Sequence, residues 1–261
     1  MDVNSRPIGI FDSGLGGLTV VKEIIKLLPN EDLIYLGDTA RVPYGTRSKE
    51  TIIKFSFEDA NFLLEKDIKC LVIACNTSSA LAGAELKKKL KIPVFDVITP
   101  ALKVAKEISK SGKIGVIGTR GTIGSGAYSV SFSKACPLFV PFIEEGEIEG
   151  EAIEMIAKNY LSDFNKENID TLILGCTHYP IIKDIIEKEI GNIVKLVDPG
   201  ISVANELKEF LTKNKMLKNQ TKNGQRNYFV TDYTERFVKV AEMFLGEKIK
   251  SRLRKINLTS S

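Results

Sequence analysis

Two cysteines in this sequence occur in the same local context, and they are the residues from which chemistry is most directly predicted. The apolar run 71–74 leads into Cys75, and the apolar run 172–175 leads into Cys176. Each cysteine is followed by hydrogen-bonding residues and then by apolar residues at helical spacing. This pattern predicts two thiols, each located where a buried strand ends and a helix begins.

The chemistry expected of two such thiols is proton transfer. Ligands of open parallel sheets bind beyond the carboxyl ends of the strands. The first turn of a helix offers free N–H groups and a positive dipole end, which bind a carboxylate and lower the pKa of a thiol. A thiolate can act as a base and a thiol as an acid. Cys75 and Cys176 on opposite walls of a cleft therefore predict racemisation or epimerisation, and the alternative is two cysteines that only pack in the core.

Three other titratable residues could assist the thiols. His178 is the only histidine of the chain and follows Cys176 by two residues, so it could hold the thiol or exchange a proton with it. Asp12 and Glu144 are carboxylates that could play the matching role. Helix capping is the alternative role for Asp12, and an exposed acidic turn is the alternative for Glu144.

Two loops could also bind a ligand. Residues 12–17 form a glycine-rich turn between a predicted strand and a predicted helix, which is one way to bind phosphate. The turn contains neither GxGxxG nor GxxxxGK[ST], so glycines that only permit a tight turn are the alternative. The loop at 40–45 contains Pro43, Tyr44 and Gly45, and it is either a wall of a pocket or a plain surface connection.

The elements that must position these residues alternate between strand and helix along the chain. Strands are predicted at 8–11, 33–36, 71–74, 92–97, 114–118, 172–175, 194–197 and 228–232. Helices are predicted at 18–28, 49–65, 101–108, 151–161, 203–211 and 235–245. Thr99 is the predicted N-cap before Pro100. Residues 137–142 are a short apolar stretch to which no element is assigned.

This alternation predicts the α/β class, with mostly parallel sheets flanked by helices. The second half repeats the first, because a thiol strand, a helix, a strand and a proline-started helix occur twice. We predict two similar domains, formed by residues 1–97 with 210–261 and by residues 98–209. The last segment is expected to pack back onto the first domain.

Composition narrows the class of protein. The chain has 261 residues, of which 43% are hydrophobic and 27% charged, and its 37 basic and 33 acidic residues give a net charge of +4. This balance is typical of a globular protein. The basic cluster at 87–91 has no interleaved aromatic residues, so we expect a solvated face and no nucleic-acid partner. The basic residues at 248–255 are expected to be a solvated end.

The sequence also bears on location and on the state of the thiols. No apolar run reaches the roughly 18–20 residues of a membrane span, and the N-terminus lacks the features of a signal peptide. We therefore expect a cytoplasmic protein with no membrane partner, in which thiols stay reduced. Cys70, Cys75, Cys136 and Cys176 contain no CxxC spacing, so neither a disulfide framework nor a metal site is expected.

Five motifs extend these predictions. They are FDSGLGGLTV at 11–20, GDTARVPYG at 37–45, IACNTSSA at 73–80, EEG at 144–146 and LGCTHYP at 174–180. In type, order and spacing they resemble the glutamate racemase family of the aspartate/glutamate racemase superfamily, over nearly the whole chain. The resemblance implies a cofactor-independent isomerase that interconverts L- and D-glutamate and supplies D-glutamate for peptidoglycan synthesis. It also implies an active site in the cleft between two α/β domains.

The resemblance further implies roles for individual residues. Cys75 and Cys176 match the two acid/base thiols, with Cys75 acting on D-glutamate and Cys176 on L-glutamate. Asp12 beside Cys75, and Glu144 and His178 beside Cys176, match the groups that assist the thiols. The family's substrate contacts match Asp12, Ser13, Pro43, Tyr44, Gly45, Asn76, Thr77, Thr177 and His178, with Thr119 and Thr122 at supporting positions.

Hydrogen-bond donors are the second requirement of this chemistry. Removal of an α-proton creates carbanion-like charge, which donors at helix N-termini can stabilise. Asn76, Thr77 and Thr177 are expected to bind the α-carboxylate, and Thr119 and Thr122 the side-chain carboxylate. The chain departs from the family in small ways, with valine at 42 where many members have phenylalanine and Ser-Ser at 78–79 where many have Ala-Thr. Neither change removes a group that the chemistry needs.

Three other functions stay open. The chain could be a two-cysteine racemase that acts on aspartate. It could instead bind phosphate or a nucleotide at 12–17 without hydrogen exchange. It could also be a redox protein, in which Cys75 and Cys176 would form a reversible disulfide. The oligomeric state is open between a monomer and a homodimer.

Overall fold

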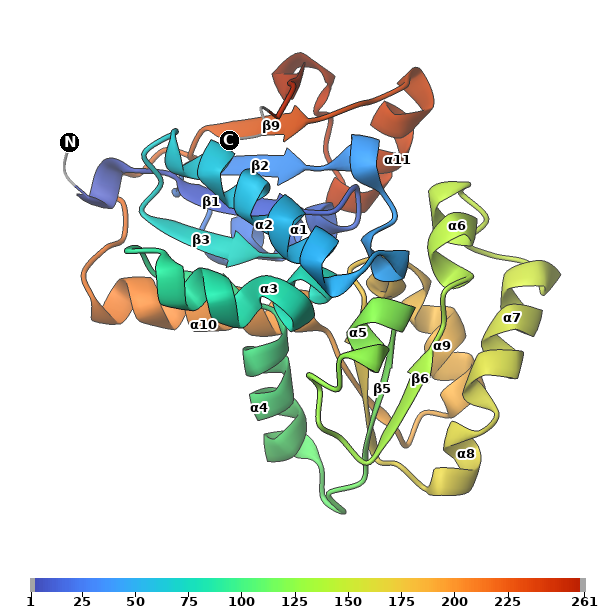
Figure 1. The fold of residues 1–261 in the computed structure, drawn as a ribbon. Coiled ribbons are helices and arrows are strands. Elements are labelled where there is room, and N and C mark those ends of the chain that lie inside the picture. Colours follow the sequence, from blue (N-terminus) through green and yellow to red (C-terminus); the bar gives the residue numbers. More distant parts are fainter. Residues whose placement is uncertain (1–2, 259–261) are drawn as a thin grey trace.

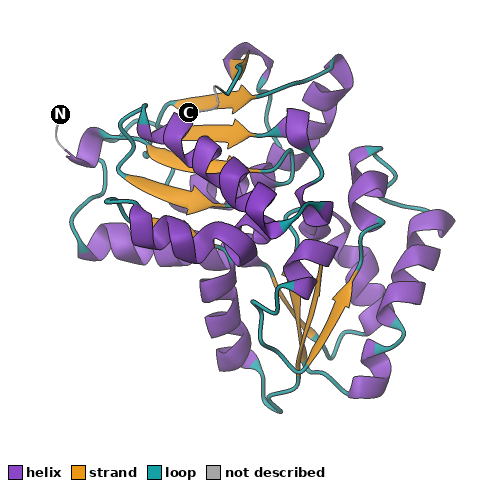
Figure 2. Ribbon diagram, in the orientation of Figure 1, coloured by secondary structure: helices purple, strands orange, loops and turns teal. Residues whose placement is uncertain are grey.

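The computed structural model describes residues 3–258, and within these residues the strands form two sheets (Figure 1). The first sheet has the strand order β10-β9-β2-β1-β3-β4, and the second has the order β6-β5-β7-β8. Every described strand pair is parallel. Helices flank both sheets (Figure 2). The predicted α/β fold with two parallel sheets is therefore confirmed.

The described elements have the following bounds. The strands are β1 (Ile8–Asp12), β2 (Leu33–Gly37), β3 (Cys70–Ile73), β4 (Val94–Asp96), β5 (Ile114–Gly118), β6 (Phe132–Ala135), β7 (Thr171–Gly175), β8 (Lys195–Val197), β9 (Arg226–Val230) and β10 (Leu253–Lys255). The α-helices are α1 (Gly17–Leu27), α2 (Lys49–Leu64), α3 (Asn76–Lys89), α4 (Ile98–Ile108), α5 (Arg120–Gly124), α6 (Phe139–Glu144), α7 (Glu151–Leu161), α8 (Phe164–Glu167), α9 (Lys183–Ile190), α10 (Pro199–Lys213) and α11 (Glu235–Leu245). Short 3-10 turns are η1 (Val3–Ser5), η2 (Thr39–Arg41), η3 (Tyr44–Thr46), η4 (Tyr179–Ile182) and η5 (Lys250–Arg252).

The central strands are apolar because both of their faces are covered. Along β1, Ile10 packs in the cluster that contains the apolar face of α1, whereas Phe11 packs in the cluster that contains residues of α2 and α3. Neither side chain is exposed to solvent. Consecutive side chains of a strand point to opposite faces, so a parallel sheet between two helix layers needs an uninterrupted apolar run. The runs that precede the two cysteines have this composition for the same reason.

Sheet topology sets the position of the two cysteines. In the first sheet β3 lies between β1 and β4, and its carboxyl end leads to Cys75. In the second sheet β7 lies between β5 and β8, and its carboxyl end leads to Cys176. Helix α10, which follows β8, packs against both α1 and α4 and so links the two parts of the chain.

The C-terminal segment returns to the first sheet, as expected. Strand β9 pairs with β2, and α11 has the predicted bounds. Strand β10 pairs with β9 inside the region that had been expected to be only a solvated end. The division of the chain at 97/98 and 209/210 stays a prediction. None of the helices within residues 3–258 combines the length and apolar character that a membrane span requires.

Three local features differ from the sequence-based expectations. Strand β6 was not predicted, because it is an edge strand whose residues are only partly buried. Helix α6 was not predicted in the apolar stretch 137–142, where Pro141 lies in the first helical turn and is tolerated there. Thr99 is not the N-cap of α4, since the carboxylate of Asp96 accepts hydrogen bonds from the backbone of Ile98 and Thr99, both at 2.8 Å.

The buried ion pair between Lys69 and Glu31 connects the N-terminal and C-terminal parts of the chain to the first sheet. Lys69 Nζ lies 2.5 Å from Glu31 Oε2, and both side chains are almost fully buried. The ammonium also donates to the carbonyl groups of Asn4 and Met216. Glu31 Oε1 accepts a hydrogen bond from the backbone of Lys218 at 2.8 Å. The pair thereby fixes the start of the loop that leads into β9.

We expect Lys69→Met to lower the free energy of unfolding by about 3–5 kcal/mol, because it leaves a buried carboxylate without its counter-charge. Urea unfolding followed by far-UV circular dichroism measures the loss. Lys26→Met is the matched control, since Lys26 forms an exposed pair with Glu23 that contributes at most about 1 kcal/mol. Equal losses in the two variants would show that burial does not increase the contribution of the Lys69–Glu31 pair to the free energy of unfolding.

Candidate active site

A cavity of about 380 Å³ lies at the carboxyl ends of the two sheets. It contains both thiols of the repeated pattern together with His178 and Glu144. The complete lining consists of Ser13, Gly14, Val42, Pro43, Tyr44, Gly45, Thr46, Cys75, Asn76, Thr77, Thr119, Arg120, Pro137, Val140, Pro141, Glu144, Cys176, Thr177 and His178. Segments from both sheets therefore enclose one space, as the two-thiol hypothesis requires.

Cys75 lies at the N-terminus of an α-helix, as its sequence context predicts. It is the N-cap residue of α3, and the backbone N–H of Ser78 donates to its sulfur at 3.5 Å. Its sulfur also lies 3.5 Å from Ser13 Oγ, on the turn that follows β1. Only 5% of Cys75 is exposed. The thiol is thus held between the ends of β1 and β3, with one side on the cavity.

The pKa of Cys75 differs from the expectation. Burial, followed by the negative charge of Asp12, raises the pKa of this thiol to about 11, although its hydrogen bonds with Ser13 and Ser78 act in the opposite direction. The prediction that the helix terminus lowers this pKa is therefore wrong for Cys75. The loss of hydration outweighs the helix field, because the thiol is enclosed on almost every side. Cys75 is therefore a protonated thiol at neutral pH.

Cys176 lies at the end of β7, but no α-helix begins directly after it. The chain first makes the 3-10 turn η4, and α9 starts only at Lys183. The predicted helix start at this cysteine is therefore wrong. Pro180 occupies an early position of the 3-10 turn, where its missing N–H breaks no hydrogen bond. The electrostatic surroundings of the Cys176 sulfur are therefore set more by neighbouring side chains than by a helix dipole.

Those side chains are the imidazole of His178, which contacts the Cys176 sulfur, and the carboxylate of Glu144, which contacts the imidazole. His178 Nδ1 lies 3.8 Å from the sulfur of Cys176, and His178 Nε2 lies 3.0 Å from Glu144 Oε1. Burial disfavours the charged imidazole, but the hydrogen bonds to Cys176 and Glu144 outweigh it and raise the pKa of His178 to about 10. At neutral pH the ring is an imidazolium, which can donate to both neighbours.

Asp12 lies behind the cavity wall rather than on it. Its side chain is fully buried, and its Oδ2 accepts a hydrogen bond from the backbone of Gly14 at 2.9 Å. Its Oδ1 has no hydrogen-bond partner among the residues that the structure describes. Burial raises the pKa of Asp12, while the positive charge of His178 lowers it. The carboxyl holds the turn after β1 and places negative charge near Cys75, as the pKa of that thiol reflects.

Three threonine hydroxyl groups join the two parts of the chain beside the cavity. Thr77 Oγ1, at the start of α3, lies 3.0 Å from Thr119 Oγ1 and 3.3 Å from Thr122 Oγ1. Thr119 is the N-cap of α5 and accepts a hydrogen bond from the backbone of Thr122. Thr119 lines the cavity, but Thr122 is buried outside the lining. Thr122 therefore supports the other two hydroxyl groups from behind.

A tyrosine that the sequence did not single out fixes one of the polar groups of the cavity. The hydroxyl of Tyr128, between α5 and β6, donates to Asn76 Oδ1 at 2.6 Å. This contact occupies the carbonyl oxygen of the Asn76 amide, so its NH₂ group is left to serve as a donor. Nothing in the local sequence around Tyr128 predicts this contact, because it joins residues from opposite parts of the chain.

Two glycines are required where the parts of the chain approach most closely. A Cβ atom at Gly16 would lie 2.1 Å from Thr177 Oγ1 and 2.6 Å from His178 Nδ1. A Cβ atom at Gly45 would lie 2.7 Å from the Cβ of Thr119. The glycine-rich turn therefore brings the loop after β7 close to the end of β1, which gives its composition a reason other than phosphate binding.

The structure thus brings together most of the predicted site residues. Thr46, Arg120, Pro137, Val140 and Pro141 also line the cavity but were not predicted. Pro137, Val140 and Pro141 belong to the segment that leads into and forms α6. Because this helix was not predicted, the cavity wall that it forms was not predicted either. Among the described residues, no group of three or more His, Cys, Asp and Glu side chains is placed to hold a metal ion.

Comparisons with known proteins agree with this arrangement. Residues 8–207 match the family described as Asp/Glu/Hydantoin racemase. The glutamate racemase of Geobacter metallireducens is 49% identical over 254 residues, which are 94% of each chain, and that of Aquifex aeolicus is 48% identical over 94% of this chain and 96% of its own. The crystal structure of glutamate racemase from Francisella tularensis in complex with D-glutamate superposes with a TM-score of 0.92, at 44% identity, over 99% of this chain and 100% of that one.

The agreement covers the whole fold and both halves of the cavity. The matched family segment includes both cysteines, and the solved structure covers almost every residue at an identity that supports more than a shared fold. The chain therefore belongs to the Asp/Glu/hydantoin racemase family and, within it, to the glutamate racemases.

Proposed function

We propose that the protein interconverts L- and D-glutamate by proton transfer between two thiols, without a cofactor. The observation that carries the proposal is the presence of Cys75 and Cys176 in one cavity, at equivalent ends of two parallel sheets. The complex of the Francisella tularensis relative with D-glutamate supports the substrate. A cavity of about 380 Å³ is ample for an amino acid of this size.

The proposed steps use one thiolate and one thiol at a time. For L-glutamate, the Cys176 thiolate removes the α-proton, and the Cys75 thiol delivers a proton to the opposite face of the carbon. The products are D-glutamate, a Cys176 thiol and a Cys75 thiolate, and the reverse reaction uses the thiols in exchanged roles. The imidazolium of His178 stabilises negative charge on the Cys176 sulfur in the starting state. Proton exchange with solvent, through His178 at one wall, restores the starting state.

The negative charge that develops on the substrate needs fixed donors. Asn76 and Thr77 occupy the first turn of α3, where backbone N–H groups are free, and both line the cavity. We assign them with Thr177 to the α-carboxylate. Thr119 is assigned to the side-chain carboxylate, with Thr122 holding its hydroxyl from behind. Ser13 and the wall formed by Pro43, Tyr44 and Gly45 complete the substrate contacts.

The biological setting is a further part of the proposal. We place the reaction in the cytoplasm, where the free thiols of the described structure would stay reduced. Its product would supply D-glutamate for peptidoglycan synthesis, and membership of the glutamate racemases supports this role. Assembly as a homodimer is a separate hypothesis, which light scattering on the purified protein would test.

The substrate assignment is tested by optical activity. We expect the circular dichroism signal of L-glutamate to decay to zero when the purified, reduced protein is added without any cofactor. L-Aspartate, measured in parallel, is expected to keep its signal over the same period. Decay with aspartate alone would transfer the activity to the alternative substrate, and no decay with either, in a folded protein, would contradict the proposed function.

We expect Cys75→Ser and Cys176→Ser each to slow racemisation by roughly 10²–10⁴-fold, because a hydroxyl group is a much weaker acid and base than a thiol. Cys136→Ser is the matched control, since Cys136 is buried but does not line the cavity. Rates are measured from both enantiomers by circular dichroism. Full racemisation by either site variant would rule out the two-thiol mechanism.

The role of Glu144 can be measured at the single histidine of the chain. Because the pKa of His178 in the folded protein is raised to about 10, the imidazolium is complete at neutral pH and is lost as pH rises through about 10. Glu144→Gln removes one cause of the shift, so we expect the titration midpoint of His178 to fall by about one unit or more. Proton NMR of the imidazole, in protein without a histidine tag, follows the midpoint. Racemisation by this variant should then fail at a lower pH than in the wild type.

Glu147→Gln is the control for this experiment, because it removes the same charge from an exposed side chain close to α6. Its midpoint should equal that of the wild type. An unchanged midpoint in Glu144→Gln would show that the contact between Glu144 and His178 does not hold the proton on the ring.

A further inference from the structure

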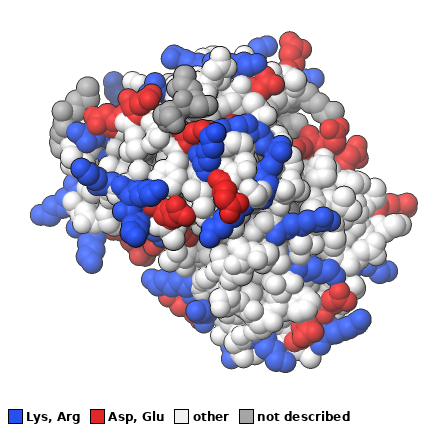
Figure 3. Space-filling view, viewed as in Figure 1, with Lys and Arg blue, Asp and Glu red and all other residues white. Residues whose placement is uncertain are grey.

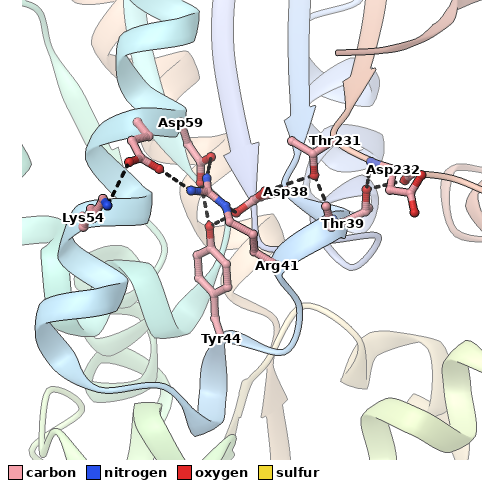
Figure 4. Close-up of polar contacts among 10 residues, drawn as sticks. Asp38, Thr39, Arg41, Tyr44, Lys54, Asp59, Thr231 and Asp232 are labelled. Carbon is pink, nitrogen blue, oxygen red and sulfur yellow. Dashed lines mark hydrogen bonds and ion pairs between the residues drawn. The ribbon is translucent and has the colours of Figure 1, made fainter. Parts of the chain in front are cut away.

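The cavity wall formed by Pro43, Tyr44 and Gly45 lacks regular secondary structure. The connection between β2 and α2 contains only the short turns η2 and η3, so side-chain contacts must hold it in place. Tyr44 is 1% exposed and packs against the ring of Phe55, with ring centroids 5.6 Å apart. Figure 4 shows its hydroxyl pointing at a group of charged side chains from the end of β2 and from α2.

That group has more carboxyl groups than cations. Arg41 contacts three of them, with Nε 2.5 Å from Asp38 Oδ2, Nη2 3.2 Å from Asp59 Oδ1, and Nη1 on Glu58. Asp38 and Asp59 are fully buried. Among the described residues, the one other cation close to this group is the largely exposed Lys54, whose Nζ lies 3.9 Å from Glu58 Oε1. Three carboxylates around one partly buried guanidinium would leave excess negative charge inside the protein.

The hydrogen bonds of the Tyr44 hydroxyl indicate that a proton on one of these carboxyl groups removes the excess negative charge. The phenolic oxygen contacts Asp38 Oδ2 and lies 3.0 Å from Asp59 Oδ2. A phenol has a single O–H, so it can donate to one of these carboxyl groups only. The second contact is a hydrogen bond only if that carboxyl group carries the proton and donates it to the phenolic oxygen.

The surrounding contacts identify which carboxyl group this is. Asp38 accepts from Arg41 Nε through Oδ2 and from Thr231 Oγ1 through Oδ1 at 3.0 Å, so both of its oxygens are acceptors. Asp59 Oδ1 accepts from Arg41, which leaves Oδ2 as the only oxygen that can hold a proton and face Tyr44.

We propose that Asp59 is a positioning residue that stays protonated at neutral pH and donates a hydrogen bond to Tyr44, which in turn donates to Asp38. The hydrogen bonds from Asp59 to Tyr44 and from Tyr44 to Asp38 then hold the cavity wall against α2 and the end of β2. Burial first, and then the charge of Asp38, raise the pKa of Asp59 well above its usual range, with Arg41 acting against them. Tyr44 and Glu58 are the remaining titratable groups that act on Asp59, and Asp59 in turn acts on Tyr35.

The link to the reaction rests on the proposed function. Tyr44 and Gly45 line the cavity, and Gly45 lies close to Thr119 on the opposite part of the chain. Displacement of this loop would widen the cavity on the side of the substrate carboxylates without moving either thiol. Loss of the Asp59 hydrogen bond should therefore weaken substrate binding more than it slows the chemical step.

Two substitutions separate a protonated Asp59 from an anionic one. Asp59→Asn keeps a donor toward Tyr44 and an acceptor toward Arg41, so we expect KM for L-glutamate within about twofold of the wild type. Asp59→Ala removes both, and we expect KM to rise roughly tenfold with a smaller change in kcat. Glu50→Gln, an exposed charge removal on α2, is the control for helix charge. Equal damage in Asp59→Asn and Asp59→Ala, or no damage in either, would overturn the proposal.

A second measurement does not depend on activity or on the folding of the alanine variant. The infrared difference spectrum between the wild type and Asp59→Asn at neutral pH should contain the C=O band of a protonated carboxylic acid. A difference spectrum with only carboxylate bands would overturn the proposal. Because this readout uses the folded protein without substrate, it is separate from the test of glutamate racemisation by the wild type.

Discussion

The close approach of two parallel sheets at their carboxyl ends is the constraint on which the rest of the structure depends. Two groups can act on opposite faces of one carbon only if separate parts of the chain meet around a space as small as an amino acid. Gly16 and Gly45 permit this approach, because a side chain at either position would collide with the opposite part of the chain. The threonine hydroxyl groups of α3 and α5 then join the two parts beside the cavity.

Similar strand ends do not give the two thiols similar surroundings. Cys75 caps an α-helix and has the buried Asp12 nearby, and its pKa is raised to about 11. Cys176 precedes a 3-10 turn and has an imidazolium held by Glu144 at its sulfur. This asymmetry gives the site one proton donor and one sulfur next to a cation, which is the arrangement that a two-thiol exchange needs to act on L-glutamate. Helix α6 is essential to it, because this helix carries Glu144.

Sequence reasoning succeeded where a single segment carries the signal. Apolar runs predicted the buried strands that end at Cys75 and Cys176, and helical periodicity gave the bounds of α11. It failed where the deciding contact comes from a distant segment. Asp96 displaces Thr99 as the cap of α4, Tyr128 reaches Asn76 from another part of the chain, and the raised pKa of Cys75 follows from enclosure that no local pattern reveals.

The central claim is that two different groups handle the α-proton, and the isotope content of the product tests it most directly. L-Glutamate is incubated with the protein in D₂O and the reaction is stopped at low conversion, after which the enantiomers are separated and analysed by mass spectrometry. Because the Cys75 thiol exchanges with solvent before it acts, the newly formed D-glutamate should carry deuterium while the remaining L-glutamate keeps its proton. Newly formed D-glutamate that retains the original proton would contradict the claim, since a single base would then have returned the proton it removed.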